Sequence, residues 1–399
     1  MILNLIAFTS VLHDGSMVRS SHEALINELE KCFEKVNILT VEEAAALPDD
    51  TFRALFIATG GVECQVKDAF DTLPDPALLV ADGTHNSLAA ALEIATFLRA
   101  RGLGSEVVHG TVSQIAERLV QLSRLHDVRS KLTGRRIGVD PEAAKERWGL
   151  ELVHLPLERV YEYYDAIPDG DVAEACAALS ARAKGCVEPD AKDLTKAMRL
   201  AVALKRLADE ENLSALTLAC FRLLERTGTT GCLALSLLND EGIMAGCEGD
   251  LQTLFTMMLV QAATGKASFM ANPSKIDTYS NEVVMAHCTI GLGQTQGFIL
   301  RNHFESLSGV AIQGMLPQGK VTVVKCGGPE LDSYFVTSAY LQENLNHHNM
   351  CRTQVRLHFN QPASYFLRHS LGNHHVLLIG DQADLLNDLL TAAGCTRVK

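Results

Sequence analysis

In the first third of the chain, short apolar runs alternate with stretches whose apolar residues recur at helical spacing. The apolar runs are predicted strands, at 3–8, 54–58, 77–81 and 106–109. The stretches between them are predicted helices, at 20–36, at 87–101 and from 112 onward. Strands that are apolar throughout and alternate with helices are typical of a parallel sheet covered on both faces. The pattern predicts an α/β domain over residues 1–130.

A second region of the same kind begins after a Lys-Leu-Thr-Gly segment at 131–134. Its predicted strands lie at 135–139, 150–155, 215–219 and 267–270. Long helical patterns separate the strands, at 171–184 and 192–211. These elements predict a second α/β domain over residues 131–280.

The pattern changes near Asn281, where apolar runs begin to recur at short spacing with glycine-rich turns between them. These runs lie at 283–289, 298–304, 310–315, 321–324, 334–341, 355–359 and 376–379, and a helical pattern follows at 383–393. Closely spaced strands with such turns predict antiparallel β structure, as a barrel or a sandwich. This third domain covers residues 281–399.

Composition narrows the possible functions. The chain has 399 residues and a net charge of -13, which gives no electrostatic support for nucleic-acid binding. An anionic ligand would need a local cluster of Arg or Lys. The 11 Cys form no CxxC pair and no zinc spacing, so we expect reduced thiols. The apolar start has no basic segment before it and is interpreted as a core strand, and no apolar run is long enough for a membrane span. We expect a soluble cytoplasmic protein.

Glu248 and Asp250 flank a glycine just before the helical pattern at 251–263. The helix dipole favours acids at a helix N-terminus, so capping alone would explain Asp250. Glu248 lies before the helix in a loop of small residues, where capping does not explain it. We therefore regard Glu248 as a candidate catalytic or metal-binding residue.

Several histidines lie near polar or acidic residues in the predicted β region. They are His287, His303, His374 and His375. A lone histidine beside a strand is usually structural, but several together favour a metal or polar site. Histidine with carboxylate oxygens suits Mn²⁺ better than a thiolate zinc site.

The motifs resemble those of the metal-dependent L-fucose isomerase/L-arabinose isomerase family over nearly the whole chain. They are Cys247-Glu248-Gly249-Asp250, His287-Cys288, Gly372-Asn373-His374, Gly380-Asp381, Ala58-Thr59-Gly60-Gly61 and Asn86-Ser87-Leu88. The resemblance implies two flavodoxin-like α/β domains followed by a C-terminal β-barrel. It also implies an aldose–ketose isomerase that acts on an open-chain sugar through an enediolate.

In that family a Glu, an Asp and a His bind Mn²⁺, and the two carboxylates move the proton between C1 and C2. The resemblance assigns these positions to Glu248, Asn272 and His374, with His375 as a competitor of His374. The Asn272 carbonyl can bind a cation, but a neutral amide cannot serve as a base. In order of preference, the candidates for the missing base are Glu305, Asp277 and His287.

The preference for Glu305 depends on reading 301–305 as part of a strand. Alternation would then place Arg301, His303 and Glu305 on one face. These side chains either lie over the substrate, with Glu305 as the base, or form a solvated surface. A second departure from the family lies at 139–142, where a Pro-Ser-Asp-Trp-like loop is replaced by Val-Asp-Pro-Glu.

Cationic residues near these motifs raise the question of an anionic substrate. Arg301, Lys325 and Arg352 could hold a sulfonate, carboxylate or phosphate if they converge, or could be solvated surface charge. A sulfonated sugar such as sulfoquinovose is thus an alternative to fucose or arabinose. The candidate substrate-binding residues are His287, His303, Arg301, Arg352, His375, Thr59, Glu63 and Asn86.

The Thr59-Gly60-Gly61 segment follows a predicted strand, and Asn86 precedes a predicted helix. The simplest interpretation is a tight turn and a helix cap. The resemblance instead implies a homotrimer or homohexamer in which these loops, with Glu63, complete the pocket of a neighbouring chain. A different class of function, a non-catalytic sugar-binding or regulatory protein on the same scaffold, is supported by Asn272.

Overall fold

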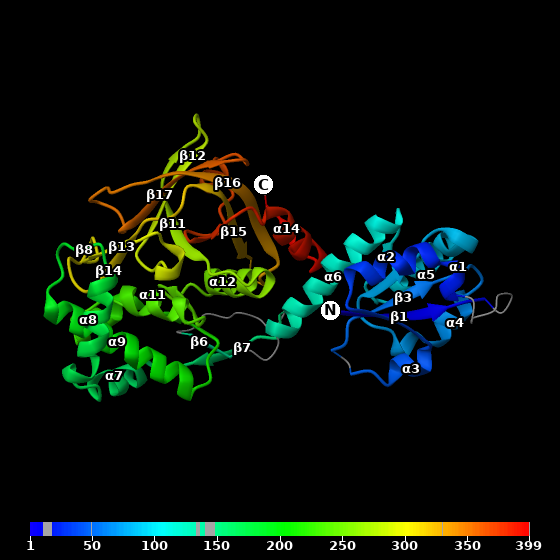
Figure 1. The fold of residues 1–399 in the computed structure, drawn as a ribbon, viewed down its shortest axis with the longest axis horizontal. Coiled ribbons are helices and arrows are strands. Elements are labelled where there is room, and N and C mark those ends of the chain that lie inside the picture. Colours follow the sequence, from blue (N-terminus) through cyan, green and yellow to red (C-terminus); the bar gives the residue numbers. More distant parts are fainter. Residues whose placement is uncertain (11–17, 49, 133–135, 140–147, 329, 399) are drawn as a thin grey trace. The chain divides into compact units, whose positions relative to one another are not determined.

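The computed structural model describes residues 1–10, 18–48, 50–132, 136–139, 148–328 and 330–398 (Figure 1). The chain forms two compact units, Met1–Ser130 and Lys131–Lys399. Residues 140–142, at the second departure from the isomerase pattern, lie outside the described residues.

The first unit is built on a parallel sheet of five strands. The strands are β1 (Ile2–Phe8), β2 (Lys35–Leu39), β3 (Arg53–Ile57), β4 (Ala77–Val80) and β5 (Ser105–Val108). Their spatial order is β2-β1-β3-β4-β5, which is the flavodoxin-like order. The helices are α1 (Val18–Ser21), α2 (Glu23–Cys32), α3 (Val41–Ala45), α4 (Glu63–Asp68), α5 (Ser87–Ala100) and α6 (Val112–Leu132), with short 3₁₀ turns at Phe70–Thr72 and Thr84–Asn86. The predicted parallel α/β fold is confirmed here.

The edge strand β2 was not predicted, because the helical pattern was extended to residue 36. Helix α2 ends at Cys32, and the chain is extended from Phe33 onward. Every residue of β2 is at least partly exposed, whereas β3 and β4 are buried almost throughout. A half-exposed edge strand lacks the continuous apolar run on which the prediction depended.

The second unit begins with a four-stranded parallel sheet. Its strands are β6 (Arg136–Val139), β7 (Glu151–His154), β9 (Ala215–Leu218) and β10 (Met244–Cys247), in the order β10-β9-β6-β7. The helices are α7 (Leu157–Asp165), α8 (Ala173–Arg182), α9 (Ala191–Glu210), α10 (Cys220–Thr227), α11 (Cys232–Asp240) and α12 (Leu251–Thr264), with a 3₁₀ turn at Asp169–Val172. If these four strands are numbered 1 to 4 along the chain, their order from the β7 edge is 2-1-3-4. The first four strands of the first sheet have the same order.

Six antiparallel strands then close into a barrel, as predicted. They are β11 (Phe269–Asp277), β12 (Glu282–His287), β15 (Gly319–Gly327), β16 (Ser333–Asn344), β17 (Thr353–Phe359) and β18 (His375–Ile379). The order is β15-β18-β11-β12-β17-β16, and pairing of β15 with β16 closes the ring. The remaining elements are the 3₁₀ turn Leu292–Gln294, α13 (Tyr365–Arg368), α14 (Ala383–Ala392) and β19 (Thr396–Arg397), which pairs with β16.

Two strand assignments need correction. The run at 267–270, assigned to the second α/β region, is the start of the barrel strand β11. The runs at 298–304 and 310–315 form β13 (Phe298–Arg301) and β14 (Ala311–Gly314), which make a small separate sheet with β8 (Gly185–Cys186). Neither correction was visible in the apolar pattern, because barrel and sheet strands of this length have similar patterns.

Helix α12 joins the two parts of the second unit. It follows β10 of the parallel sheet and lies next to barrel strand β15 (Figure 1), with contacts to β18 as well. All of its residues from Thr253 to Val260 are buried, which explains its apolar composition. No described helix has both the length and the apolar character that a membrane crossing requires. The loop before α12 therefore lies where the α/β part meets the barrel.

Candidate functional site

Glu248 follows β10 directly, and its backbone adopts an unusual conformation. Its φ is 61° and that of Gly249 is 71°, both in the left-handed region. A Cβ on Gly249 would meet nothing within 4 Å, so the backbone conformation rather than close packing favours glycine there. A non-glycine residue in this region costs about 1 kcal/mol or more. The turn places a carboxylate, 38% exposed, at the carboxyl edge of the sheet, where ligands of parallel sheets bind.

Asp250 caps α12 and also holds a buried cation. Its carboxylate accepts hydrogen bonds from the Thr253 amide at 2.8 Å and from the Thr253 hydroxyl at 2.6 Å. Lys325 Nζ lies 3.3 Å from the same carboxylate, and the Lys325 side chain is 1% exposed. Burial opposes ionisation of Asp250, but the His374 hydrogen bond, the Lys325 charge and the Thr253 donors hold its pKa well below the usual value.

His374 precedes β18 and is almost fully buried. Its Nδ1 lies 3.1 Å from Asp250 Oδ2, and its carbonyl oxygen lies 3.3 Å from the Thr253 hydroxyl. A carboxylate facing Nδ1 favours the proton on that nitrogen, so Nε2 presents its lone pair. His374 Nε2 is buried without a hydrogen-bond partner, 3.7 Å from Glu248 Oε2.

Asn272 supplies a second buried atom that could bind a cation and that has no hydrogen-bond partner. Its Oδ1 accepts no hydrogen bond from the described residues. The preceding residue, Ala271, pairs with His375 of β18 in antiparallel register. Continuing that register by one residue brings Asn272 opposite His374 on the same face of the sheet.

The end of β10 lies beside the same part of β11. The Cys247 amide donates a hydrogen bond to Met270 Sδ at 3.3 Å. Because side chains alternate along a strand, Asn272 faces the same side as Met270, toward the loop that carries Glu248. Glu248 and His374 thus lie together, and the β11–β18 register brings Asn272 beside His374. Two oxygens and an imidazole nitrogen, two of the three buried and unpartnered, fit a divalent cation such as Mn²⁺.

His287, at the end of β12, extends this cluster. Its Nδ1 lies 3.0 Å from the Thr289 hydroxyl, and its ring centroid is 5.2 Å from that of His374. One of its nitrogens lies within 4.8 Å of both a Glu248 oxygen and Cys247 Sγ. Burial, followed by the repulsion of neighbouring imidazoles, holds the pKa of His287 well below its usual value. His287 is therefore a neutral imidazole beside the Glu248 carboxylate.

His303 is also neutral, and its tautomer is set by the turn that follows it. The Ser306 amide donates to His303 Nδ1 at 3.3 Å, and the Ser306 hydroxyl lies 3.2 Å from the same nitrogen. A ring nitrogen that accepts from an amide carries no proton, so the proton is on Nε2. Burial lowers the pKa of His303, although the nearby Glu305 charge acts in the opposite direction. The ring presents an N–H donor.

The three candidate cations have different partners. Arg301 contacts Glu188 through Nε at 2.8 Å and Nη2 at 2.6 Å. Arg352 instead donates to neutral groups of Asn302, from Nε to the carbonyl at 2.8 Å and from Nη2 to Oδ1 at 2.6 Å. Its distance to the Glu188 carboxylate is 4.0 Å. Lys325 is paired with Asp250. Of the three, Arg352 has the least compensated charge.

The strand expected to carry Glu305 ends too early for that prediction to hold. Strand β13 stops at Arg301, and His303 begins a turn in which the Leu307 amide donates to the His303 carbonyl at 2.9 Å. Leu307 has a φ of 53°, which an extended strand does not permit. The predicted shared face of 301, 303 and 305 is therefore wrong. Glu305 is exposed on the turn.

Two other candidates have hydrogen-bond partners outside the cluster around Glu248. Asp277, at the end of β11, accepts hydrogen bonds from the backbone amides of Tyr279 and Ser280 in an exposed turn. His375 lies in an aromatic cluster, with Nε2 2.9 Å from the Tyr365 hydroxyl. Burial lowers the pKa of His375 to about 3. The neighbouring histidines thus have different surroundings.

The candidates in the first unit lie at the carboxyl edge of its sheet. The Thr59 hydroxyl accepts from the Ser10 amide at 2.8 Å, and Glu63 begins α4. Asn86 has a φ of 59° and is the N-cap residue of α5, without a side-chain capping hydrogen bond. The contacts of Thr59 and the positions of Glu63 and Asn86 at helix starts are thus explained within the first unit itself. The sharing of this loop with a neighbouring subunit, and the trimer or hexamer, stay predictions.

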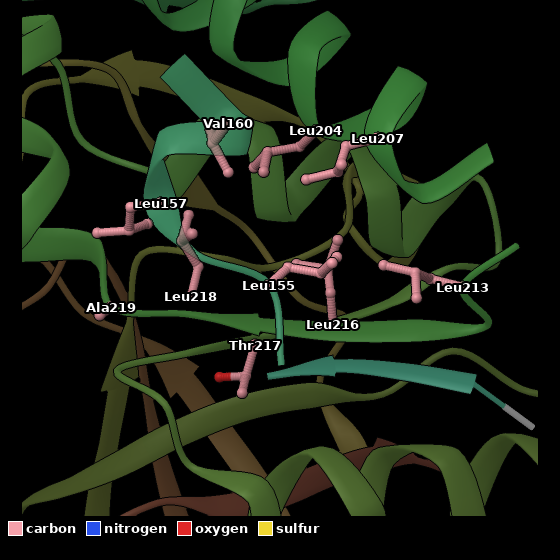
Figure 2. A pocket seen from close by; sticks show the side chains of 10 residues that line it. All are labelled: Leu155, Leu157, Val160, Leu204, Leu207, Leu213, Leu216, Thr217, Leu218 and Ala219. Carbon is pink, nitrogen blue, oxygen red and sulfur yellow. The ribbon is translucent and has the colours of Figure 1, made fainter. Parts of the chain in front are cut away.

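A small apolar cavity in the second unit is not a candidate for polar chemistry. It has a volume of about 30 Å³ and lies between α7, α9 and β9 (Figure 2). Its lining, largely leucine, is Leu155, Leu157, Val160, Leu204, Leu207, Leu213, Leu216, Thr217, Leu218 and Ala219. No charged group lines it, so it offers nothing to hold a sugar's hydroxyl groups or a cation.

Comparison with known proteins finds partial sequence similarity to sugar isomerases. No family model matches the chain. The chain is 26% identical over 131 residues to a sulfoquinovose isomerase from Alkalicoccus urumqiensis, covering 31% of this chain and 30% of that protein. It is 23% identical over 190 residues to a sulfoquinovose isomerase from Priestia aryabhattai, covering 46% and 42%. A sulfoquinovose isomerase from Clostridium sp. (strain MSTE9) is 24% identical over 142 residues. The matches thus span less than half the length of these curated relatives.

Two residues of the site had no signal in the sequence. Glu188 follows a two-residue strand and pairs with Arg301, which is 113 positions away. Asn302 holds Arg352 through its own carbonyl and amide oxygens. Their roles depend on contacts between distant segments, which neither spacing nor periodicity reveals.

Proposed function

We propose that this chain is an aldose–ketose isomerase that acts on an open-chain sugar with a divalent cation, Mn²⁺, held by Glu248, Asn272 and His374. The observation that carries the proposal is a pair of buried atoms without hydrogen-bond partners among the described residues, Asn272 Oδ1 and His374 Nε2, the second of which lies 3.7 Å from Glu248 Oε2. A buried polar atom without a partner costs about 1–3 kcal/mol, which a bound cation would offset. The similarity to sulfoquinovose isomerases supports the reaction class and a sulfonated sugar.

The chemistry follows from the positions of the side chains. A bound cation would polarise O1 and O2 of the sugar. The Glu248 carboxylate takes the C2 proton, the C–H electrons form the C1=C2 bond, and the C1=O electrons move to O1. Return of that proton to C1, with transfer of a proton from O2 to O1, gives the ketose. Asp250 keeps His374 oriented throughout, since its carboxylate faces Nδ1.

The test is ketose formation from a panel of aldoses in the presence of Mn²⁺. The panel contains sulfoquinovose, glucose, fucose and arabinose. Turnover of at least one aldose that depends on added Mn²⁺ is the expected result. If the purified chain holds stoichiometric Mn²⁺ but converts no sugar of the panel, the isomerase proposal is wrong.

The amide at 272 makes a specific prediction about metal affinity. Asn272→Asp adds a negative charge to the proposed ligand set, so Mn²⁺ should bind roughly tenfold more tightly or better. Calorimetric titration of the chain, stripped with EDTA, measures this. Asn360→Asp, at an exposed position, serves as the control and should leave the affinity unchanged. Unchanged affinity in Asn272→Asp would place the cation elsewhere.

The second proton-transfer group should be His287 rather than Glu305. His287 is neutral and close to the Glu248 carboxylate, whereas Glu305 is exposed on a turn. We expect His287→Gln to lower kcat about 100-fold. Glu305→Gln should retain most of the activity.

Steady-state kinetics at saturating Mn²⁺ distinguish these two residues. His358→Gln, at an exposed position on β17, is the matched control for His287. Loss of turnover in Glu305→Gln together with a fully active His287→Gln would reverse the assignment.

A non-catalytic sugar-binding protein is the second candidate, and Asn272 is the observation that favours it. With an amide in place of a carboxylate, the set has one negative charge instead of two. Metal content of the purified chain by mass spectrometry separates the candidates. Stoichiometric Mn²⁺ supports the enzyme, whereas a metal-free chain that binds sugars supports the binding protein.

A further inference from the structure

Two guanidinium groups and one carboxylate lie together at the small sheet formed by β8, β13 and β14. Arg301 and Arg352 are 6% and 5% exposed, and Glu188 lies within 4.0 Å of both. Two positive charges and one negative charge leave a net charge of +1. Glu188 already contacts Arg301 through both of its oxygens. An uncompensated buried charge is costly, so this cluster is suited to an anion from outside the chain.

Arg352 is the member of this cluster with a hydrogen-bonding group to spare. Its Nε and Nη2 are held by the two oxygens of Asn302. Its Nη1 has no hydrogen-bond partner among the described residues, and it is not one of their buried unpartnered atoms. Two of the three nitrogens therefore fix the plane of the guanidinium, and the third is accessible to a ligand.

Contacts with neighbouring residues connect Arg352 to the proposed active site. The Arg352 amide donates to Cys288 Sγ at 3.4 Å, and Cys288 follows His287. Asn302, which holds the guanidinium, precedes His303. The His303 ring lies within the electrostatic influence of both Arg352 and Glu248. Arg352 and the Glu248 carboxylate thus both lie close enough to the His303 ring to influence its charge.

We propose that Arg352 binds the anionic terminus of the substrate, and that this terminus is a sulfonate. The inference rests on the proposed function, in which Glu248 acts at C1 and C2 of the sugar. A sulfonate is permanently charged and has three acceptor oxygens, which suit the planar donors of an arginine. Sulfoquinovose is an aldose whose sixth carbon carries a sulfonate, at the far end of the sugar from C1 and C2.

The most informative variant is Asn302→Asp, which is isosteric and keeps both oxygens that hold Arg352. The new carboxylate neutralises the remaining positive charge of the cluster. An anionic sugar should therefore no longer bind more tightly than a neutral one. Calorimetric titration of the Mn²⁺-loaded full chain with sulfoquinovose and with glucose measures the advantage directly. The wild-type chain should prefer sulfoquinovose about 10- to 100-fold, and Asn302→Asp should reduce the preference to about threefold or less.

Arg352→Gln tests the same site by removing the charge, and Arg356→Gln is its matched control. Arg356 lies on β17, the strand that begins directly after Arg352, but pairs with Glu343 at 2.8 Å on the surface, so its removal should leave the preference unchanged. Circular dichroism establishes whether each variant is folded. Arg352→Gln should lose affinity for sulfoquinovose about 10- to 100-fold and keep its affinity for glucose. A comparable loss for glucose in a folded variant would overturn the subsite.

Other anions identify the ligand class. Glucose 6-phosphate and glucuronate carry a phosphate and a carboxylate at the same end of the sugar. Tighter binding of either than of sulfoquinovose would overturn the sulfonate assignment. Equal affinity of the wild-type chain for sulfoquinovose and glucose would overturn the anion subsite, even if isomerisation is observed. Conversely, an Arg352-dependent preference without turnover of any aldose would support the subsite and overturn the isomerase proposal.

Discussion

Replacement of Glu248 by Gln should lower kcat/KM for the aldose substrate by about a thousandfold or more. The amide cannot accept the C2 proton, and it is a weaker ligand than the carboxylate for the proposed cation. Gln has nearly the same shape, and the Glu248 side chain is partly exposed, so the fold should be unaffected. Kinetics at saturating Mn²⁺, with unfolding followed by circular dichroism, measure both quantities.

Glu343→Gln is the appropriate control for this variant. Glu343 forms a partly exposed ion pair with Arg356 on the barrel, and exposed pairs contribute about 1 kcal/mol or less. The control should keep wild-type activity and near wild-type stability. If Glu248→Gln retained activity within tenfold of the wild type, Glu248 would not be the proton-transfer group, and the proposed mechanism would fail at its first step.

Asp250→Asn should produce the largest loss of stability among these variants. It leaves the buried Lys325 ammonium without its counter-charge, and breaking such a pair costs about 3 kcal/mol or more. It also removes the carboxylate that orients His374, so Mn²⁺ affinity should fall about 10- to 100-fold. Chemical denaturation and metal titration measure the two effects separately.

A double variant separates the two roles of Asp250. In Asp250→Asn/Lys325→Met no unpaired charge is buried, so most of the lost stability should return while Mn²⁺ affinity stays low. Asp165→Asn, which breaks the exposed pair with Arg226, is the control and should cost less than about 1 kcal/mol. Full recovery of metal affinity in the double variant would show that Asp250 does not orient His374.

The same carboxylate makes stability depend on pH in a definite direction. The pKa of Asp250 is lower in the folded chain than in the unfolded chain, where it is about 3.9. Its contribution is therefore complete above the unfolded value and decreases as the pH falls below about 4 toward the folded value. Asp250→Asn should show a shallower decrease in stability over this acidic range than the wild type.

The sequence was most informative where burial is continuous. Strands β1, β3 and β4 are largely apolar because helices cover both faces, and each of their predicted bounds lies within one residue of the observed bound. Strand β10, Met-Ala-Gly-Cys, was interpreted as a loop, since it is short and its small residues lack β-propensity. Its position in the sheet is set by pairing with β9, which no local pattern encodes.

The site was predicted only as far as single residues carry recognisable chemistry. Asp250 was explained as a helix cap, which it is, but its contact with His374 spans 124 positions and was not foreseen. Glu305 was preferred as a base because a strand was assumed to continue past Arg301. The first error came from a contact distant in sequence, and the second from a turn that interrupts an apolar run.

The position of β18 within the barrel has a consequence for folding. This strand is near the end of the described chain, yet it inserts between β11 and β15 and places His374 opposite Asn272. Contacts between residues far apart in sequence form slowly, because the intervening chain must first be ordered. The helices and the parallel sheets can therefore form while the cluster around Glu248 is still open. During refolding, helical signal should return earlier than the capacity to bind metal.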